Sequence, residues 1–502
     1  MMESKDYIYP APLLGDFYKQ SHRVQYPKGT ELVYSTWESR VALPPLDFTT
    51  SAVAFGFQAF CKEYLIDYFN EYFFSRPKDE VVTEYARFIK YTLGDQNPET
   101  QHIERLHDLG YVPLLIKAVK EGTQVPCRVP MLTVENTVSE FYWLTNFVET
   151  LLSCQTWVAS TSATSAREFR KMMNEYCEKT GGAKGFVQFQ GHDFSMRGMA
   201  SLDAALMSGG AHLLSFTGTD TAPCVLWLER YYNANIEKEL VGTAIPATEH
   251  SVMQIQGKNE YEVYKHLMTK TYPGGFLSIV SDTWDLWNVL DNVVPRLKDT
   301  IMARDGRVVI RPDSGDPTKI ICGDPDGETE TQRKGVVEKL WDIFGGFITD
   351  KGYKHLDTHI GCIYGESMSI SAARQILDGL EAKGFASTNM VLGIGSVAYQ
   401  FVSRDTLAFT FKCTYAVVNG EERLVYKAPS TDKSQIKYSP KGLVVVKKDE
   451  DGKLVCVDNL NREQWMGYNS VDLLEPIFED GKLLRDQTLA EIREILWGPG
   501  VF

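Results

Sequence analysis

Apolar and polar positions follow two different patterns along this chain: mainly helical periodicity before residue 180, and short apolar runs that alternate with helical stretches after it. From residue 52 to 74 apolar side chains recur every three or four positions, which predicts a helix, and shorter helices are expected at 78–93 and 99–109. Two extended apolar runs around a turn predict a small antiparallel module at 112–136. A long helical pattern then covers 138–178.

From residue 186 to 396 short apolar runs alternate with helical stretches such as 283–296 and 334–344. This alternation predicts a parallel sheet, either open or closed into a barrel. The expected strands are 186–189, 212–216, 244–246, 276–280, 308–310, 359–363 and 391–394.

Beyond residue 400 the pattern becomes antiparallel, with strands expected at 408–418, 423–427 and 442–448. We therefore expect an α/β protein with three regions. These are an N-terminal helical and β-rich region (1–180), an α/β barrel-like catalytic region (181–400) and a C-terminal β-rich region (401–502) that packs with the N-terminal module.

Polar groups follow each predicted strand of the middle region. In open and closed parallel sheets alike, ligands bind at the carboxyl ends of the strands. Seven such ends in succession indicate a functional site. They carry His192-Asp193-Phe194 with Arg197, Gly218-Thr219-Asp220, Glu249-His250-Ser251, Ser278 with Ser281-Asp282, Arg311 with Asp313, Gly365-Glu366-Ser367, and Gly393-Ile394-Gly395-Ser396.

The stretch Val308–Pro317 combines a predicted buried strand with several charged and polar residues directly after it. Three apolar residues form a short buried strand, and Pro312 ends it because proline has no N–H and holds Arg311 extended. Arg311 offers a planar fork suited to phosphate. Asp313 can accept from sugar hydroxyls or face a developing positive charge. An Arg–Asp pair that only closes a loop is the alternative interpretation.

Composition limits the classes of partner. The 502 residues carry a net charge of −14, so nucleic acid and anionic membranes are not expected partners, and an anionic substrate must be held by local basic residues. Nine cysteines without a CxxC pair, no visible signal peptide and no apolar run of membrane length predict a cytoplasmic protein. No histidine has metal-ligand spacing, so no protein metal site is expected.

A set of motifs, in order and nearly end to end, resembles the nicotinamide phosphoribosyltransferases of the type II phosphoribosyltransferase family. They are Asp16-Phe17-Tyr18-Lys19 with His22, Tyr26-Pro27, His192-Asp193-Phe194 with Arg197-Gly198, Gly218-Thr219-Asp220-Thr221, Glu249-His250-Ser251, Ser281-Asp282, Ile310–Gly315 and Phe411-Lys412-Cys413. The resemblance implies a distorted α/β barrel and a second β-rich domain formed from the N- and C-terminal parts. It also implies a homodimer with shared active sites.

The reaction implied by the resemblance joins nicotinamide to 5-phosphoribosyl 1-pyrophosphate, which gives nicotinamide mononucleotide and pyrophosphate in NAD biosynthesis. Mg²⁺ and ATP, as a co-substrate, are also implied. The pyridine nitrogen has a free lone pair and no proton to lose, so catalysis is expected to come from positioning and electrostatics.

By resemblance, Phe194 stacks on the nicotinamide ring and Tyr18 of the partner subunit covers the other face. Asp220 accepts from the carboxamide, Asp313 faces the ribose and ring, and Arg197 and Arg311 hold pyrophosphate. Gly365 and Glu366 bind the ribose hydroxyls, Gly395 and Ser396 the 5′-phosphate, and Arg40, Arg404, Lys412 and Lys427 line the phosphate channel. Ser278 is a further expected substrate-binding residue.

His250 is the residue that the resemblance makes a phosphohistidine, formed from ATP, with Glu249 and Asp282 to orient the imidazole. With Arg311 and Asp313 these residues are the expected catalytic set. A hydrogen-bonded structural histidine is the alternative for His250.

Two departures from the family pattern concern the ribose phosphate: Glu366 stands where the family has Asp, and Ser396-Val397 interrupt a run of glycines. Two other functions stay open, a nicotinate phosphoribosyltransferase and a non-catalytic nucleotide-binding dimer.

Overall fold

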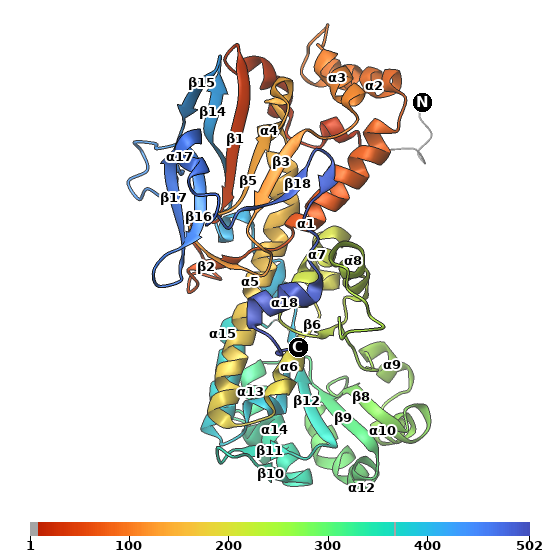
Figure 1. Ribbon diagram of the computed structural model, residues 1–502. Coiled ribbons are helices and arrows are strands. Elements are labelled where there is room, and N and C mark those ends of the chain that lie inside the picture. The colour runs from red at the N-terminus through yellow and green to blue at the C-terminus, as the bar shows by residue number, and fades with distance from the viewer. Residues whose placement is uncertain (1–8, 366–367) are drawn as a thin grey trace. The chain divides into compact units, whose positions relative to one another are not determined.

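The computed structural model describes residues 9–365 and 368–502, which form two compact units. The first comprises the chain up to Thr164, Trp227–Ala234 and Val402–Pro499. The second comprises Ser165–Leu226, Asn235–Phe401 and Gly500–Phe502. Figure 1 labels the helices and strands of both units.

A parallel sheet of six strands is the centre of the second unit, in the order β7-β6-β13-β12-β9-β8. Every neighbouring pair in it is parallel. The strands are β6 (Gly191–Asp193), β7 (Gly218–Thr219), β8 (Gly274–Val280), β9 (Asp305–Arg311), β12 (Ile360–Tyr364) and β13 (Met390–Ile394). The expected strands at 276–280, 308–310, 359–363 and 391–394 are therefore confirmed.

The two edge strands of this sheet are bridged by one segment. Thr243 forms a parallel bridge with Gly218 of β7, and Ala247 forms one with Ser278 of β8. The sheet is thereby closed into a distorted barrel, as expected. The segment itself is not a regular strand, because only its two ends pair, so the strand expected at 244–246 is wrong in its detail.

Two other strand predictions were wrong, each by a few residues. The run 186–189 is helical (η7 Lys184–Phe186 and α6 Val187–Gln190), and the strand follows at β6. The run 212–216 is the end of helix α7 (Leu202–His212) and a turn before β7. In these two runs Val187 and Phe216 are core residues of a helix and a turn, and Phe186 and Phe189 line a cavity, whereas the strand residues are small or polar.

Alternate residues of β9 face two different environments. Val308 and Ile310 are fully buried in a core shared with Leu340 of α14 (Glu330–Phe344) and Ile376 of α15 (Ile370–Ala382). Arg307, Val309 and Arg311 line a cavity on the other face. The other helices of this unit include α9 (His250–Ile255), α10 (Glu260–His266), α12 (Lys298–Met302), α13 (Pro317–Cys322) and α16 (Ser396–Tyr399).

A seven-stranded sheet organises the first unit, in the order β15-β14-β1-β5-β3-β18-β19. Red and orange N-terminal strands lie beside blue C-terminal strands in Figure 1. The expectation of a β-rich domain built from both ends of the chain is confirmed. The strands are β1 (Thr30–Glu38), β3 (Leu114–Ala118), β5 (Pro130–Asn136), β14 (Thr410–Val418), β15 (Glu421–Leu424), β18 (Glu475–Glu479) and β19 (Lys482–Leu483).

The helices expected in the N-terminal region are present with small shifts. Strand β2 (Ser51–Val53) precedes a helical run from Phe57 to Phe74, so the helix begins later than residue 52. Helices α2 (Lys78–Thr92) and α3 (Gln101–Leu109) agree with prediction, and α5 (Glu149–Thr180) accounts for most of 138–178. The remaining elements include β4 (Gln124–Pro126), β16 (Leu443–Lys448), β17 (Leu454–Leu460), α17 (Arg462–Met466) and α18 (Leu489–Trp497).

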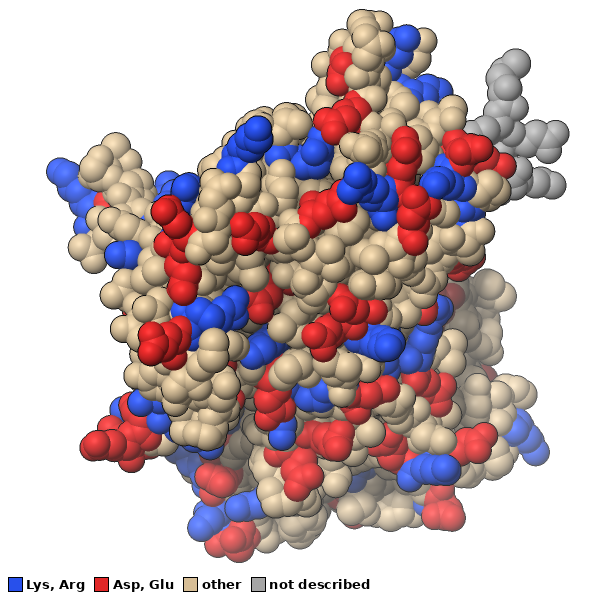
Figure 2. Space-filling view, turned by 45° about the horizontal axis from the view of Figure 1, so that its top comes forward, with Lys and Arg blue, Asp and Glu red and all other residues tan. Residues whose placement is uncertain are grey.

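Surface charge is mixed in sign. On the face in Figure 2, Lys and Arg side chains are interspersed with Asp and Glu. Among the described residues, no helix combines the length and the apolarity of a membrane span, and no cluster of His, Cys, Asp or Glu could hold a metal ion.

Candidate functional site

Residues directly after the parallel strands meet at the carboxyl edge of the second unit's sheet. Backbone hydrogen bonds fix them to the last residue of the neighbouring strand: Phe194 N donates to Ile394 O (3.0 Å), Asp220 N to Asp193 O (2.9 Å) and Ser281 N to Arg311 O (2.9 Å). The strand ends therefore act as a rigid frame for the candidate side chains.

The ring of Phe194 lies against two glycines. A Cβ atom on Gly393 would be 2.3 Å from Phe194 Cδ2, and one on Gly365 would be 3.2 Å from Phe194 Cε2 and 3.1 Å from Asp313 Oδ1. These glycines let the aromatic ring and the Asp313 carboxylate approach each other. Phe194 is half-buried, so one part of its ring remains accessible for stacking.

Asp220 contacts an imidazole. Its Oδ1 lies 2.9 Å from Nε2 of His192, and its side chain is 47% exposed. No backbone N–H of the following helix, α8 (Ala222–Tyr232), donates to this carboxylate among the described hydrogen bonds. A helix-capping role for the Asp220 side chain is therefore not supported by the described hydrogen bonds.

Arg311 and Asp313 form an ion pair, with Nε and Oδ2 3.3 Å apart. Arg311 Nη2 also donates to Thr248 O at 2.8 Å. The turn between them is held by Asp282, whose Oδ2 accepts from the backbone N–H of Asp313 at 2.9 Å and from the Ser314 hydroxyl. Loop closure and a fixed cation–anion pair are therefore both present, and the two interpretations of this motif do not exclude each other.

His250 begins helix α9 beside the two carboxylates. Its Nε2 is 3.9 Å from Asp313 Oδ2 and 4.0 Å from Asp282 Oδ1, and its Nδ1 is 2.9 Å from the Thr283 hydroxyl. Glu249 instead accepts from the hydroxyl of Ser251. The hydrogen bond that orients the imidazole thus comes from Thr283.

The candidate phosphate turn lies next to the Arg197 loop. A Cβ atom on Gly198 would be 2.5 Å from Ser396 Oγ, whereas a Cβ on Gly395 would meet no heavy atom within 4 Å. Arg197 is exposed and makes no hydrogen bond or ion pair with other described residues. Glu366 lies outside the described residues.

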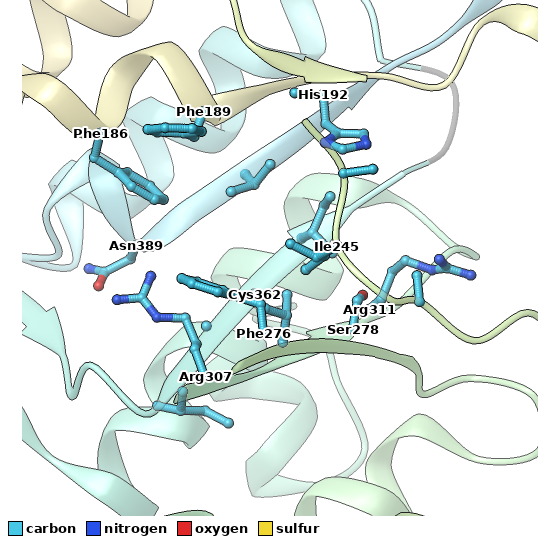
Figure 3. A pocket seen from close by; sticks show the side chains of 18 of the residues that line it. Phe186, Phe189, His192, Ile245, Phe276, Ser278, Arg307, Arg311, Cys362 and Asn389 are labelled. Carbon is cyan, nitrogen blue, oxygen red and sulfur yellow. The ribbon is translucent and has the colours of Figure 1, made fainter. Parts of the chain in front are cut away.

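A cavity of about 330 Å³ extends from these strand ends into the barrel. Phe194, Asp220, Ser278 and Arg311 line it at one end, and the Ser278 hydroxyl is buried without a hydrogen-bond partner among the described residues. Figure 3 shows the wall of the cavity, with aromatic side chains on several sides. An apolar cavity with a few convergent polar groups is typical of a small-molecule site.

The other sequence-predicted residues belong to the first unit. The Tyr18 side chain is 56% exposed, with its ring edge-on to His22. Arg40 Nη2 donates to Thr410 Oγ1 (3.1 Å), Lys412 lies 3.9 Å from Glu149, Arg404 pairs with Asp405, and Lys427 is exposed. Burial lowers the pKa of both Arg40 and Lys412.

Three residues beside the candidate site were given no role from the sequence: His192, Thr283 and Arg307. His192 follows the expected strand and could have been assigned with Asp220, because adjacent parallel strands place them side by side. Thr283 and Arg307 carry no motif, and only the fold places them at the site.

The barrel, the strand-end Arg–Asp pair and the antiparallel sheet define a type II phosphoribosyltransferase. Residues 189–464 match the model of the nicotinate phosphoribosyltransferase (NAPRTase) family, and residues 12–78 match the N-terminal domain of nicotinamide phosphoribosyltransferase. The chain belongs to this phosphoribosyltransferase family and is an enzyme of that class.

Relatives and solved structures agree on the family and the fold. The chain is 47% identical over 492 residues to a nicotinamide phosphoribosyltransferase of Acinetobacter baylyi, with 96% of each chain covered. It is 33% identical to one of Mycoplasma genitalium, with 86% of this chain and 96% of the relative covered. A nicotinate-nucleotide pyrophosphorylase structure from Pyrococcus furiosus is 15% identical, with a TM-score of 0.59 and 98% and 97% coverage, and shows the same fold. Human nicotinic acid phosphoribosyltransferase is 14% identical, with a TM-score of 0.54 and 96% and 92% coverage.

Proposed function

We propose that this enzyme is a nicotinamide phosphoribosyltransferase that makes nicotinamide mononucleotide and pyrophosphate from nicotinamide and 5-phosphoribosyl 1-pyrophosphate. The observation that carries the proposal is the position of the Asp220 carboxylate in the aromatic cavity. It lies with Phe194 at the end formed by the strand ends, which we call the outer end. An amide NH₂ donates to this carboxylate, and a hydrogen bond to a charged group contributes about 1.5–3 kcal/mol. A nicotinate carboxylate would be repelled there.

The side chains suit transfer without a general base. The pyridine nitrogen attacks the anomeric carbon with its own lone pair, and the C–O bond to pyrophosphate breaks. Asp313 would stabilise the positive charge that develops on the sugar, and Arg311 with Arg197 would take the charge of the departing pyrophosphate. The ion pair between Arg311 and Asp313 holds these opposite charges in place before the substrate binds.

The test is steady-state turnover with each base. We expect kcat/KM for nicotinamide to exceed that for nicotinate by about a thousandfold, the combined effect of a bond gained and a repulsion avoided. In Asp220→Asn the ratio should collapse with little change in melting temperature. A ratio that does not move in the variant would show that Asp220 does not select the base. A wild-type ratio in favour of nicotinate would make nicotinate the substrate, and nucleotide binding without turnover of either base would indicate a non-catalytic dimer.

Further parts of the proposal concern ATP, magnesium and assembly. Transfer of a phosphoryl group from ATP to His250, followed by hydrolysis, would drive synthesis forward; the 44% exposed imidazole beside Asp282 and Asp313 supports this role. Mg²⁺ would arrive on the phosphates of the substrates, its usual mode of binding in such sites. The cytoplasm is the proposed location. A homodimer in which Tyr18, Arg40, Arg404, Lys412 and Lys427 serve shared sites is also proposed.

A further inference from the structure

The cavity has a second end that a base beside Asp220 would not fill. Arg307 lines this second end and Arg311 the first, from the same face of β9 and four residues apart. At about 3.3 Å per residue their Cα atoms are roughly 13 Å apart, longer than one substituted pyridine ring. Figure 3 shows the two guanidinium groups at opposite sides of the labelled residues.

Arg307 is a cation with unused donors. Its Nε donates to Thr358 O at 2.8 Å, and its Cζ lies 5.9 Å from the ring centroids of both Phe186 and Phe276. Its two terminal NH₂ groups make no hydrogen bond or ion pair with other described residues. Arg311, by contrast, is already paired with Asp313.

No carboxylate among the described residues contacts Arg307 to offset the cost of burying its positive charge. Its pKa is lowered by burial, and Asp357 opposes this effect only from a distance. The Asp357 carboxylate is itself engaged by His359, at 2.6 Å from Nδ1. A partly desolvated guanidinium with free donors favours the binding of an anion.

The surroundings of Arg307 form a built site. Gly361 leaves room for its side chain, because a Cβ there would be 3.2 Å from Arg307 Cδ. Thr388 lines the same end, but its hydroxyl is fully buried and lies over Gly182, where a Cβ would be 2.4 Å from Oγ1. The rings of Phe186, Phe189 and Phe276 supply the walls.

This inner end also has its own access. A second cavity of about 460 Å³ shares Phe186, Arg307, His355 and Thr388 with the first, and the exposed side chains of Phe347 and Ile348 line it. A ligand can therefore reach Arg307 without passing Asp220.

We propose that the inner end binds a small aromatic carboxylate, with the carboxylate on the Arg307 fork and the ring among the three phenylalanines. A guanidinium binds a carboxylate through two parallel hydrogen bonds, which a neutral amide cannot reproduce. The two ends of the cavity thus select opposite charges. The inference rests on the proposed function only in assigning the outer end to the amide.

Benzoate is the probe, because it lacks the ring nitrogen and cannot be a substrate. In calorimetric titrations of the full-length enzyme, with and without saturating nicotinamide, we expect one benzoate per chain. Benzamide, the neutral isostere, should not bind under saturating nicotinamide. Arg307→Gln should weaken benzoate binding at least tenfold, and Arg307→Lys, which keeps the charge but loses the planar fork, about threefold.

Asp220→Asn is the matched control, which should leave benzoate affinity unchanged while it alters the use of nicotinamide. Equal benzoate affinity in Arg307→Gln, one-for-one displacement by nicotinamide, or no benzoate binding would overturn the proposal. If Arg307→Gln is unstable, Arg307→Lys takes its place, and equal benzoate affinity in that variant would also overturn the proposal. Turnover of nicotinamide is measured separately, so a failure of the proposed function would be recognised as such.

Discussion

The imidazole of His192 and the carboxylate of Asp220 are joined across two adjacent parallel strands, with Nε2 and Oδ1 2.9 Å apart. In the register of these strands His192 pairs with Gly218 and Asp193 with Thr219, so Asp220 follows directly after the paired residues. A Cβ on Gly218 would lie 2.7 Å from His192 Nδ1, so only a glycine at this position leaves room for the imidazole ring. The contact occupies one carboxylate oxygen and leaves the other for a ligand.

His192 is therefore predicted to position Asp220. In His192→Ala the KM for nicotinamide should rise about tenfold, the equivalent of roughly 1.4 kcal/mol from one lost hydrogen bond to a charged group. Selectivity against nicotinate should fall in parallel. His192→Gln, whose amide can donate from a similar position, should recover most of the selectivity. Equal selectivity in wild type and His192→Ala would show that the contact is only structural.

Gly393→Ala is predicted to displace the ring of Phe194, because the new Cβ would be 2.3 Å from Cδ2. We expect a rise in KM for nicotinamide of at least tenfold, with a smaller change for phosphoribosyl pyrophosphate. Gly395→Ala is the matched variant, since its Cβ meets no protein atom within 4 Å and its predicted effect is on the phosphoribosyl substrate. Steady-state kinetics with each substrate varied separate the two. The same KM pattern in both variants would contradict the assignment.

Hydrophobic patterning correctly predicted the strands that contribute apolar side chains of their own to the core. Strand β9 has Val308 and Ile310 in the core, and hydrophobic patterning is enough to find it. Strand β6 is Gly-His-Asp, and its Gly191 lies against the ring of Phe216, with no room for a side chain (2.7 Å from a Cβ). Such a strand is stabilised by backbone pairing with its neighbours, and the pattern of apolar positions in its own sequence does not reveal it.

For the candidate site, the sequence pattern located the strand ends, and the family resemblance supplied the predicted roles of their residues. Residues at strand ends, such as Asp220 and Asp313, could be found because polar groups after an apolar run are conspicuous. Thr283 and Arg307 could not, since an isolated hydroxyl and a strand arginine are common on any surface. Their relevance comes from the fold, which directs one to His250 and the other into the cavity.

Shared active sites are predicted to be visible by complementation. Tyr18 is an exposed aromatic residue of the first unit, whereas Asp313 is at the strand ends of the second. Tyr18→Ala and Asp313→Ala chains should each be nearly inactive alone. After co-refolding, part of the activity should return, because some mixed dimers hold one site with both native residues. Verified heterodimers without recovered activity would reject shared sites.

His212 is predicted to contribute to the acid sensitivity of the fold. It is fully buried between Tyr399 OH (2.7 Å from Nδ1) and Gly218 O (3.0 Å from Nε2). Burial lowers its pKa to about 4, against an opposing effect of Asp193. Because the neutral form is favoured in the folded state, its contribution is present above the ordinary pKa of 6.5 and is lost as the pH falls from there toward 4.

The measurement is thermal unfolding across this range for wild type and His212→Gln, which keeps a donor and an acceptor but does not titrate. The variant should be less stable at pH 7.5 and lose less stability between pH 6.5 and 4. If both proteins lose the same amount, the acid sensitivity comes from other groups.

Thr283 is predicted to determine which nitrogen of His250 would accept the phosphoryl group in the proposed reaction with ATP. If the Thr283 oxygen accepts from Nδ1–H across the observed 2.9 Å, the lone pair lies on Nε2, which faces Asp282 and Asp313. Nε2 is then the nucleophile. Removing the hydroxyl in Thr283→Val should lower ATP hydrolysis about tenfold, the value of one hydrogen bond of roughly 1.4 kcal/mol.

Two control variants distinguish the effect of orienting the His250 imidazole from the effect of removing it. Thr283→Ser keeps the hydroxyl and should retain most of the ATPase activity, whereas His250→Ala should abolish it and leave some phosphoribosyl transfer. Phosphorus NMR of the phosphorylated enzyme should place the label on Nε2 in wild type and on both nitrogens in Thr283→Val, because the tautomer is then no longer held. ATPase activity that persists unchanged in His250→Ala would exclude a phosphohistidine. A label on Nδ1 in wild type would exclude the role of Thr283.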